Sequence, residues 1–360
     1  MKLSFSKIHD SFKLNGNHFN PKDLKELAID FIKDGEPYEV QIGSFLIDWL
    51  DQNEYVNVST SGSTGTPKTI KLAKEALVNS AIATGLFFNL KPTNKALHCL
   101  PSGYIAGKMM LVRAMVLGLE IDCVNPTSKL QINNNKTYHF SAMVPLQVRN
   151  NSNAVHNIKT LIIGGSKVSK SLEAQLIESS CNSYETYGMT ETVTHVAVRQ
   201  LQSKFLKVQP YFKALPSIHF SQDHRQCLVI NAPKITNTVV VTNDIVRLIS
   251  DTSFELLGRF DNVINSGGVK LFPEQIEAKL HVILKQRFMV ASIKDETLGE
   301  KLVLIIENPS EAIATISNKI KTLKTLDKFE IPKVIYALDS FVETNSGKLQ
   351  RGKTLQKVLA

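Results

Sequence analysis

Cysteine is scarce in this chain, and no two cysteines are close together. Only four occur in 360 residues, and they include no C-x-x-C pair: Cys99, Cys123, Cys181 and Cys227. Disulfide frameworks and structural zinc sites need closely spaced cysteines. We therefore expect neither kind of site. Widely spaced thiols are typical of a protein of the reducing cytoplasm, which is the location that we expect.

Long apolar stretches are also missing. Apolar runs such as LVLII at 302–306 are far shorter than the roughly 20 residues that a membrane-spanning helix needs. The first residues, MKLSFSKIHDSF, show no apolar core followed by a small-residue cleavage site, so no signal peptide is predicted. We expect no insertion into a membrane. The content of 43% hydrophobic and 21% charged residues is that of an ordinary soluble protein, and the length allows two domains.

A concentrated block of one charge is absent as well. The net charge of +9 comes from 42 basic and 33 acidic residues that are spread along the chain. Nucleic-acid binding is typical of a basic stripe that also carries aromatic side chains, so we expect no nucleic acid as a partner. A site for polyanionic small molecules would suit this charge, and so would solubility alone. The composition leaves a homo-oligomer open.

The order of apolar patterns predicts an α/β fold. Asn20-Pro21 before KDLKELAIDFIKD predicts a capped helix, and IGSFLIDWLD predicts a second one. From residue 55 to about 180, strand-like and helical segments alternate, which indicates an α/β sheet covered by helices on both faces. After residue 200 short strands dominate, among them TVVVTN and IVRLIS, and they predict a small β-rich subdomain.

A smaller α+β unit is expected at the end of the chain. Glycine and asparagine cluster in GRFDNVINSGG (258–268), where the boundary is best placed. The sequence therefore predicts an N-terminal domain of residues 1–260 and a C-terminal domain of residues 261–360.

The stretch VSTSGSTGTPKTIKL (58–72) combines hydroxyl side chains with glycine and proline. It is not a Walker phosphate loop, because Gly62 and Gly65 are only three apart and Pro67 precedes Lys68. The β-branched Thr69-Ile70 predicts a strand where a Walker loop has a helix. The stretch is thus predicted to be a strand-loop-strand turn whose N–H groups and hydroxyls could cradle a phosphate. Taken alone, a plain surface turn fits it as well.

Further segments, in the same order, make the chain resemble the adenylate-forming family of acyl-CoA synthetases, luciferases and peptide-synthetase adenylation domains. The resemblance extends from about residue 55 to residue 355, and TND stands where the family usually has T-G-D. Its segments are TSGSTGTPK (60–68), YGMTET (187–192), TND (242–244), GRFDNVINSGGVKLFPEQIE (258–277) and NSGKLQR (345–351).

The resemblance implies a reaction in two halves. A carboxylate first attacks the α-phosphate of ATP to give an acyl-adenylate, and the thiol of CoA then displaces AMP. The first half gathers several negative charges, so the protein must supply fixed donors and cations. In the family the N-terminal domain binds ATP and the acyl group, and a small mobile C-terminal domain carries the catalytic lysine.

The resemblance also implies a nucleotide site. Lys68 would support the phosphate loop, Asp244 would accept hydrogen bonds from the ribose, and Arg259 would reach the ribose or the α-phosphate as a catalytic cation. Glu191 would hold Mg²⁺. The other expected ATP-binding residues form the phosphate loop and the adenine contacts: Thr60, Ser61, Gly62, Ser63, Thr64, Gly65, Thr66, Gly164, Gly165, Tyr187, Gly188 and Thr190. Without the resemblance, Tyr187 would fit a core tyrosine, and Asp244 and Arg259 ordinary surface charges.

Three further roles follow from the resemblance near and beyond the boundary. Lys348 matches the lysine that stabilises charge on the α-phosphate during adenylation. Asp261 matches the hinge about which the C-terminal domain turns between the two half-reactions; a capping aspartate is the alternative. Gly267 and Gly268 would line the channel for the pantetheine arm of CoA.

Within the family, the short chain and the segment YGMTETVTHVAVR are most similar to the o-succinylbenzoate–CoA ligases of menaquinone biosynthesis. The resemblance implies an acyl pocket near Thr192, Thr194 and His195. Tyr104 stands where the family often has a histidine and is expected at the same pocket; an aromatic gate could survive this change, whereas no role that needs an imidazole is expected. A rim or core histidine is the alternative for His195.

Lys108 and Arg113 follow on an otherwise apolar predicted helix. They are five residues apart and so would not share a face. Either could pair with the second carboxylate of o-succinylbenzoate, and surface cations that extend to solvent are the alternative.

Two other functions remain open at this point. One is another aryl- or acyl-CoA ligase, or a stand-alone adenylation domain. The other, of a different class, is a non-catalytic adenylate-binding protein. It is disfavoured because the residues expected for catalysis and nucleotide binding are intact: Glu191, Asp244, Arg259 and Lys348.

Overall fold

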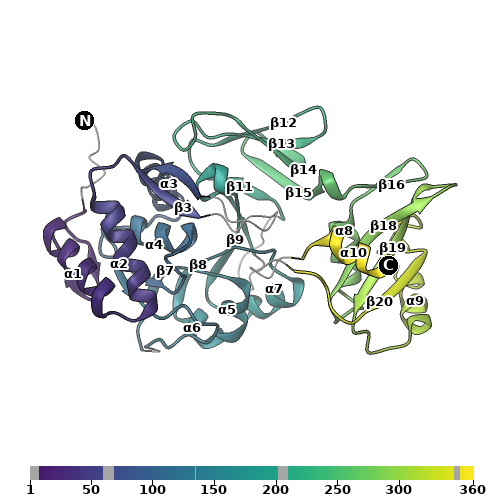
Figure 1. The fold of residues 1–360 in the computed structure, drawn as a ribbon, viewed down its shortest axis with the longest axis horizontal. Helices are drawn as coiled ribbons and strands as arrows, with labels where there is room; N and C mark the ends of the chain where they lie inside the picture. The colour runs from purple at the N-terminus through teal and green to yellow at the C-terminus, as the bar shows by residue number, and fades with distance from the viewer. Residues whose placement is uncertain (1–7, 60–68, 134, 202–209, 344–348) are drawn as a thin grey trace.

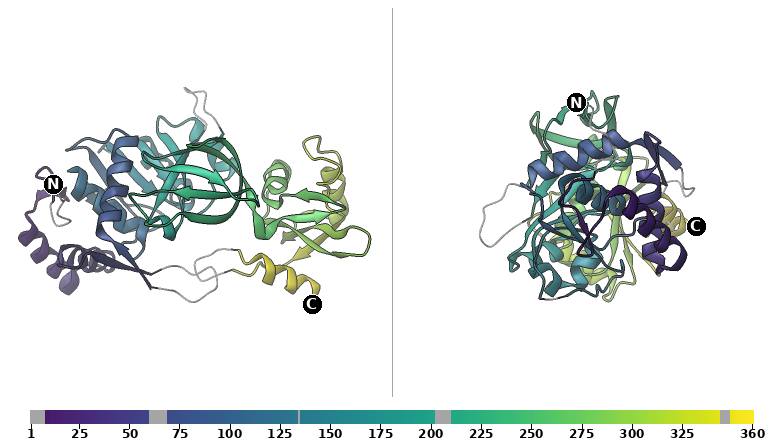
Figure 2. Two further views of the ribbon diagram at one scale, coloured as in Figure 1. Left: turned by 90° about the horizontal axis from the view of Figure 1, so that it is seen from above. Right: turned by 90° about the vertical axis from the view of Figure 1, so that its left-hand side faces the viewer.

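The computed structural model describes residues 8–59, 69–133, 135–201, 210–343 and 349–360 (Figure 1). The phosphate-loop residues 60–68 and Lys348 therefore lie outside the described residues. The molecule is elongated, with the first two helices at one end and the C-terminal elements at the other (Figures 1 and 2).

The predicted first helix begins at Pro21, as its sequence indicates. Asn20 caps it by accepting hydrogen bonds from the N–H groups of Lys22 and Asp23. No helix among the described residues is both long and apolar enough to cross a bilayer. The helices are α1 (Pro21–Asp34), α2 (Pro37–Leu50), α3 (Lys74–Phe87), α4 (Ile105–Leu117), α5 (Pro145–Asn150), α6 (Ser152–His156), α7 (Lys170–Ile177), α8 (Pro273–Leu280), α9 (Ile313–Lys321) and α10 (Arg351–Leu359).

A 13-stranded sheet forms the larger part of the molecule. In spatial order its strands are β12 (His219–Gln222), β13 (Cys227–Asn231), β14 (Val240–Ser250), β15 (Ser253–Arg259), β11 (Phe212–Ala214), β10 (His195–Gln200), β9 (Asn182–Gly188), β8 (Ile158–Ile163), β7 (Tyr138–Met143), β5 (Lys95–His98), β6 (Glu120–Cys123), β1 (Lys13–Leu14) and β2 (Asn17–His18).

The strands β6, β5, β7, β8 and β9 are parallel, and helices cover both of their faces. Ile162 on β8 belongs to the apolar core that also contains α3 and α4. Its neighbours Leu161 and Ile163 point to the opposite face, into the core that α5, α6 and α7 complete. This arrangement confirms the α/β fold predicted from the alternating segments.

The β-rich part is continuous with this parallel sheet. Strand β11 pairs with both β10 and β15, so no gap separates the two parts. The segments TVVVTN and IVRLIS, predicted as two strands, form the single strand β14. The turn-forming pair Asn243-Asp244 does not end the strand, because a register shift between Ile245 and Val246 accommodates it.

Strands β3 (Tyr55–Ser59) and β4 (Thr69–Ala73) pair antiparallel on either side of the predicted phosphate loop. This confirms the predicted strand-loop-strand arrangement and the absence of a helix directly after Lys68.

A five-stranded sheet follows residue 260. It contains β17 (Val269–Leu271), β16 (Ile264–Ser266), β19 (Gly299–Glu307), β18 (Phe288–Asp295) and β20 (Val334–Leu338). Its core is separate from that of the large sheet and is built from residues such as Ile276, Leu304 and Ile316. We propose on this basis that the two domains are residues 1–260 and 261–360.

Candidate active site

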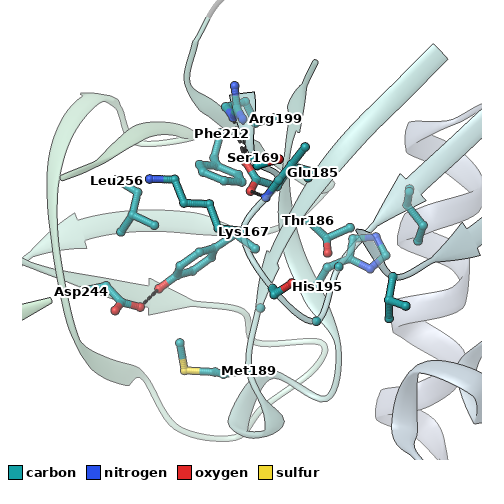
Figure 3. Close-up of a pocket in the computed structure, with 18 of the residues that line it drawn as sticks. Lys167, Ser169, Glu185, Thr186, Met189, His195, Arg199, Phe212, Asp244 and Leu256 are labelled. Atoms are coloured by element: carbon teal, nitrogen blue, oxygen red, sulfur yellow. Dashed lines mark hydrogen bonds and ion pairs between the residues drawn. The ribbon is translucent and has the colours of Figure 1, made fainter. Parts of the chain in front are cut away.

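A cavity of about 1140 Å³ lies beyond the carboxyl ends of β7, β8 and β9, where open α/β sheets bind their ligands. Residues of β14, β15 and α8 close it on the other side. Figure 3 shows Asp244 and His195 on opposite sides of this cavity. The two sides differ in chemistry: Asp244 belongs to the predicted nucleotide end and His195 to the predicted acyl end.

Glycines bring the backbone close to the cavity at the ends of β8 and β9. Gly165 has a φ of +85°, a conformation that glycine adopts without strain. A Cβ atom on Gly164 would lie 2.5 Å from the Oγ1 atom of Thr186, and a Cβ on Gly188 would collide with the backbone of Thr194. All three predicted glycines line the cavity, where an added side chain would narrow it.

Tyr187, at the end of β9, is buried in an aromatic cluster and reaches the cavity with its polar end. Its ring packs edge-to-face on Phe254, with 5.1 Å between the ring centroids. Its hydroxyl donates a hydrogen bond of 2.6 Å to Asp244 Oδ2. Burial and the Asp244 carboxylate raise the pKa of Tyr187 above its usual value, so the hydroxyl remains a donor. Tyr187 thus orients Asp244 and is at the same time a core residue.

Asp244 and Arg259 lie on neighbouring strands and face each other in register. Arg259 Nη1 donates to Asp244 Oδ1 at 3.2 Å, and Arg259 Nη2 donates to Asp261 Oδ2, also at 3.2 Å. Arg259 therefore connects the predicted ribose-binding carboxylate with the predicted hinge. Tyr187, Asp244 and Arg259 are brought together as the resemblance implies.

Asn243, which replaces the usual glycine of the family, contacts the predicted hinge directly. Its Nδ2 atom lies 3.3 Å from Asp261 Oδ2, and its Oδ1 atom accepts a 2.9 Å hydrogen bond from Arg225. Arg225 also stacks on the ring of Phe260. Arg225 was not predicted from the sequence, because it comes from the turn before β13 and meets the predicted hinge only through the fold.

The segment after Gly188 makes a 3₁₀ turn, Thr190–Thr192. Thr192 is fully buried, and its hydroxyl bonds to the backbone of Met189 and Thr194, which shapes the turn. Thr190 lines the cavity, and the Glu191 side chain is exposed beside it. The described residues contain no group of three or more metal ligands. A single carboxylate fits Mg²⁺, which is usually held by one or two carboxylates together with substrate phosphates and water.

The acyl end of the cavity contains a buried arginine. Arg113 on α4 is 2% exposed, and its Nη2 atom lies 3.4 Å both from Thr194 Oγ1 and from His195 Nδ1. The apolar wall beside it is made by Ile105 and Met109 of the same helix. Three residues singled out from the sequence, Arg113, Thr194 and His195, therefore meet in one place.

Three other predicted acyl residues do not line this cavity: Thr192, which is buried in the 3₁₀ turn, Tyr104 and Lys108. Tyr104 is 56% exposed at the start of α4. Lys108 lies on another side of α4, with its Nζ atom over the ring of Phe45 and 3.3 Å from the backbone oxygen of Asn57. The structure brings neither Tyr104 nor Lys108 to Arg113.

Gly267 and Gly268 form the turn between β16 and β17, where both have positive φ, +58° and +80°. An ion pair on the cavity wall, between the buried Glu185 and the partly buried Arg199, was not predicted from the sequence. Arg199 Nη2 lies 2.8 Å from Glu185 Oε2, across the β9–β10 pair. Cross-strand register decides this contact, and the sequence contained no signal for that register.

Comparison with known proteins supports the resemblance to adenylate-forming enzymes. The family described as AMP-binding enzyme matches residues 55–219. A solved structure from Dyadobacter fermentans, an acyl-CoA synthetase (AMP-forming)/AMP-acid ligase II-like protein, is 35% identical with a TM-score of 0.62. The match covers 93% of this chain and 98% of that one.

More distant relatives are longer. The 2-succinylbenzoate–CoA ligase of Bacillus cytotoxicus is 24% identical over 94% of this chain and 76% of its own length. The o-succinylbenzoate coenzyme A synthetase of Bacillus subtilis, solved with ATP and a magnesium ion, has a TM-score of 0.68 at 19% identity. That match covers 83% of this chain and 69% of that one, and it shows the shared fold. With a relative of similar length at 35% identity, the chain belongs to the AMP-binding family of AMP-forming acyl-CoA synthetases and AMP-acid ligases.

Proposed function

We propose that the protein activates o-succinylbenzoate with ATP and transfers the acyl group to CoA, as a step of menaquinone biosynthesis. The names of the succinylbenzoate ligases among its relatives support this substrate. The observation that carries the proposal is the buried Arg113 at the acyl end of the cavity.

Arg113 has no ionic partner within the described part of the protein. Its hydrogen-bonding contacts there are the neutral groups of Thr84, Met110, Thr194 and His195. Burial lowers the pKa of Arg113 to about 9, so the side chain still carries its charge at neutral pH. A buried charge without a partner is costly. A carboxylate of the substrate would supply that partner, which requires an acid with a second carboxylate besides the one that is activated.

The nucleotide end would hold ATP with fixed donors and acceptors. Asp244, oriented by Tyr187 and Arg259, would accept the ribose hydroxyls, and Gly164 and Gly165 would leave room for adenine. Glu191 would hold Mg²⁺, which offsets the charge of the phosphates when it is bound. The residues 60–66 and Lys68 are proposed for the β- and γ-phosphates.

The two half-reactions would use the same cavity in turn. Lys348 is proposed to stabilise the charge that develops on the α-phosphate as the acyl carboxylate attacks it. Rotation about Asp261 would then remove Lys348 and bring Gly267 and Gly268 to the pantetheine arm, so that the thiol attacks the acyl carbon and AMP leaves.

The test measures pyrophosphate release and thioester formation with o-succinylbenzoate beside benzoate, a medium-chain fatty acid and several amino acids. Turnover confined to o-succinylbenzoate, with the CoA thioester detected by mass, is the expected result. Pyrophosphate release with a different acid would overturn the substrate, and ATP binding without turnover of any acid would favour a non-catalytic adenylate-binding protein.

A further inference from the structure

The imidazole of His195 has an unused hydrogen-bonding atom at the acyl end of the cavity. His195 is 7% exposed, and its Nε2 atom is buried without a hydrogen-bond partner among the described residues. The few other buried side-chain atoms of this kind include only one on the cavity wall, Glu274 Oε2, and it belongs to α8. A buried polar group without a partner is uncommon in native proteins and calls for a ligand or water.

The contacts of His195 determine which ring nitrogen carries the proton. The guanidinium of Arg113 can only donate, and its Nη2 atom lies 3.4 Å from His195 Nδ1. The hydroxyl of Thr194 lies 3.1 Å from the same Nδ1 atom and accepts from Arg113, which leaves its own proton free to donate to Nδ1. Arg113 requires Nδ1 to be an acceptor, and the Thr194 hydroxyl can donate to it in that tautomer. In a neutral ring the proton is then on Nε2.

The ring stays neutral for a physical reason. Burial and the adjacent Arg113 charge hold the pKa of His195 well below its usual value. His195 therefore adds a directed N–H donor to the acyl end without adding a second positive charge. The positive charge beside the ring is that of Arg113.

We propose that His195, as the Nε2–H tautomer, donates a hydrogen bond to an oxygen of the bound acid, next to the carboxylate held by Arg113. The enzyme would then select acids that place an oxo group or a second carboxylate oxygen within hydrogen-bonding distance of His195 Nε2. His195 is in this view a specificity residue for the acid. The inference rests on the proposed function in that this end of the cavity holds the acyl group and Arg113 its second carboxylate.

Three variants distinguish the effect of the Nε2–H donor from the effect of the size of the ring. His195→Gln keeps an N–H donor near the Nε2 position, His195→Asn keeps a polar group only near Nδ1, and His195→Leu removes both. A hydrogen bond to a charged or strongly polar oxygen contributes about 1.5–3 kcal/mol, so its loss corresponds to roughly a 10- to 100-fold decrease in kcat/KM. We expect this decrease for the asparagine and leucine variants, through the KM of the acid, and a change of less than about threefold for glutamine.

The KM of ATP and the thermal unfolding of the variants serve as controls, and both should stay close to the wild type. All variants are compared on whichever acid the wild type activates, so failure of o-succinylbenzoate as the substrate leaves this test intact. Equal kcat/KM for the glutamine and leucine variants would overturn the proposal.

A second measurement does not depend on turnover. The ¹⁵N chemical shifts of His195 in the purified protein report its tautomer and charge directly. We expect a protonated Nε2 and an unprotonated Nδ1 throughout pH 6–8. A proton on Nδ1, or an imidazolium at pH 7, would overturn the assignment whether or not any acid is activated.

Discussion

At the scale of single residues, the two cations of α4 have different surroundings. Arg113 faces Thr194 and His195 in the cavity, whereas Lys108 contacts Phe45 and Asn57 away from it. The sequence could place both on one helix but could not tell which of them faces the ligand. Residues 109–112 are all buried, so this helix has no polar stripe that would reveal its orientation.

Replacement of Arg113 by methionine tests the role of the buried charge. We expect the KM of the acid to rise by about 100-fold, because a charged contact in a buried site is lost. The variant should be at least as stable as the wild type, since an apolar side chain of similar length replaces a buried charge without an ionic partner. Steady-state kinetics and thermal unfolding check the two effects.

Lys108→Met is the matched control on the same helix. Because Lys108 does not line the cavity, the KM of the acid should remain unchanged. A rise in the KM of the acid for Lys108→Met, together with an unchanged KM for Arg113→Met, would show that Lys108 and not Arg113 pairs with the second carboxylate of the acid.

At the scale of elements, the junction between β9 and β10 determines the geometry of the acyl end. Gly188 closes β9, and the backbone of Thr194 and His195 passes directly over its Cα atom. The sequence predicted Gly188 as an ATP-binding residue and Thr194 and His195 as residues of the acyl pocket. It did not predict their proximity, because the fold back from β9 to β10 includes a register shift after His195.

Gly188→Ala should therefore disturb two properties at once. The added Cβ meets backbone atoms that have no room to move, which is expected to cost about 1–3 kcal/mol of the free energy of unfolding. The start of β10 should shift with Thr194 and His195, and the KM of the acid should rise. Chemical denaturation and kinetics test the two effects, and Gly352→Ala, where a Cβ has open space, is the control.

The segment that joins the two sheets is held by several polar contacts. Asp261 is contacted by Asn243 and Arg259, and Asn262 donates to Glu274 of α8. We expect Asp261→Pro to impair thioester formation more than adenylation, because proline fixes φ where the proposed rotation occurs. Separate assays of pyrophosphate release and of thioester formation from a preformed adenylate measure the two steps.

Asn243→Gly is the companion variant at this hinge. It removes the amide contact to Asp261 and leaves the backbone of Asp261 free, so adenylation should continue at the wild-type rate. Equal impairment of both half-reactions in Asp261→Pro would count against a hinge at this position.

At the scale of the whole molecule, function is predicted to depend on Lys348, from the C-terminal part of the chain, acting at the cavity. The motif order allowed Lys348 to be proposed from the sequence alone. We expect Lys348→Ala to lower the rate of adenylation by about a hundred- to thousandfold, the usual effect of losing one charge-stabilising contact. Conversion of a preformed acyl-adenylate to the thioester should persist, and its loss to the same degree would remove Lys348 from this role.

The general architecture was predictable because it depends on local patterns. The alternation of apolar segments indicated the α/β part, and α1 was identified from its cap and proline. The pairing of β11 with β15 was not predictable, since it joins residues more than 40 positions apart, such as Phe212 and Phe254. The contact between Arg199 and Glu185 was not predictable because it depends on the register of β10 against β9.

The separate cores of the two sheets have a consequence for protein engineering. Only the residues between Arg259 and Ile264 join them, and α8 makes the adjoining contact through Glu274. A chimaera spliced within this short junction would leave both apolar interiors uncut. A graft of the C-terminal unit from a longer relative is therefore expected to fold, and its choice of acid should follow the parent that supplied α4 and the β9–β10 junction.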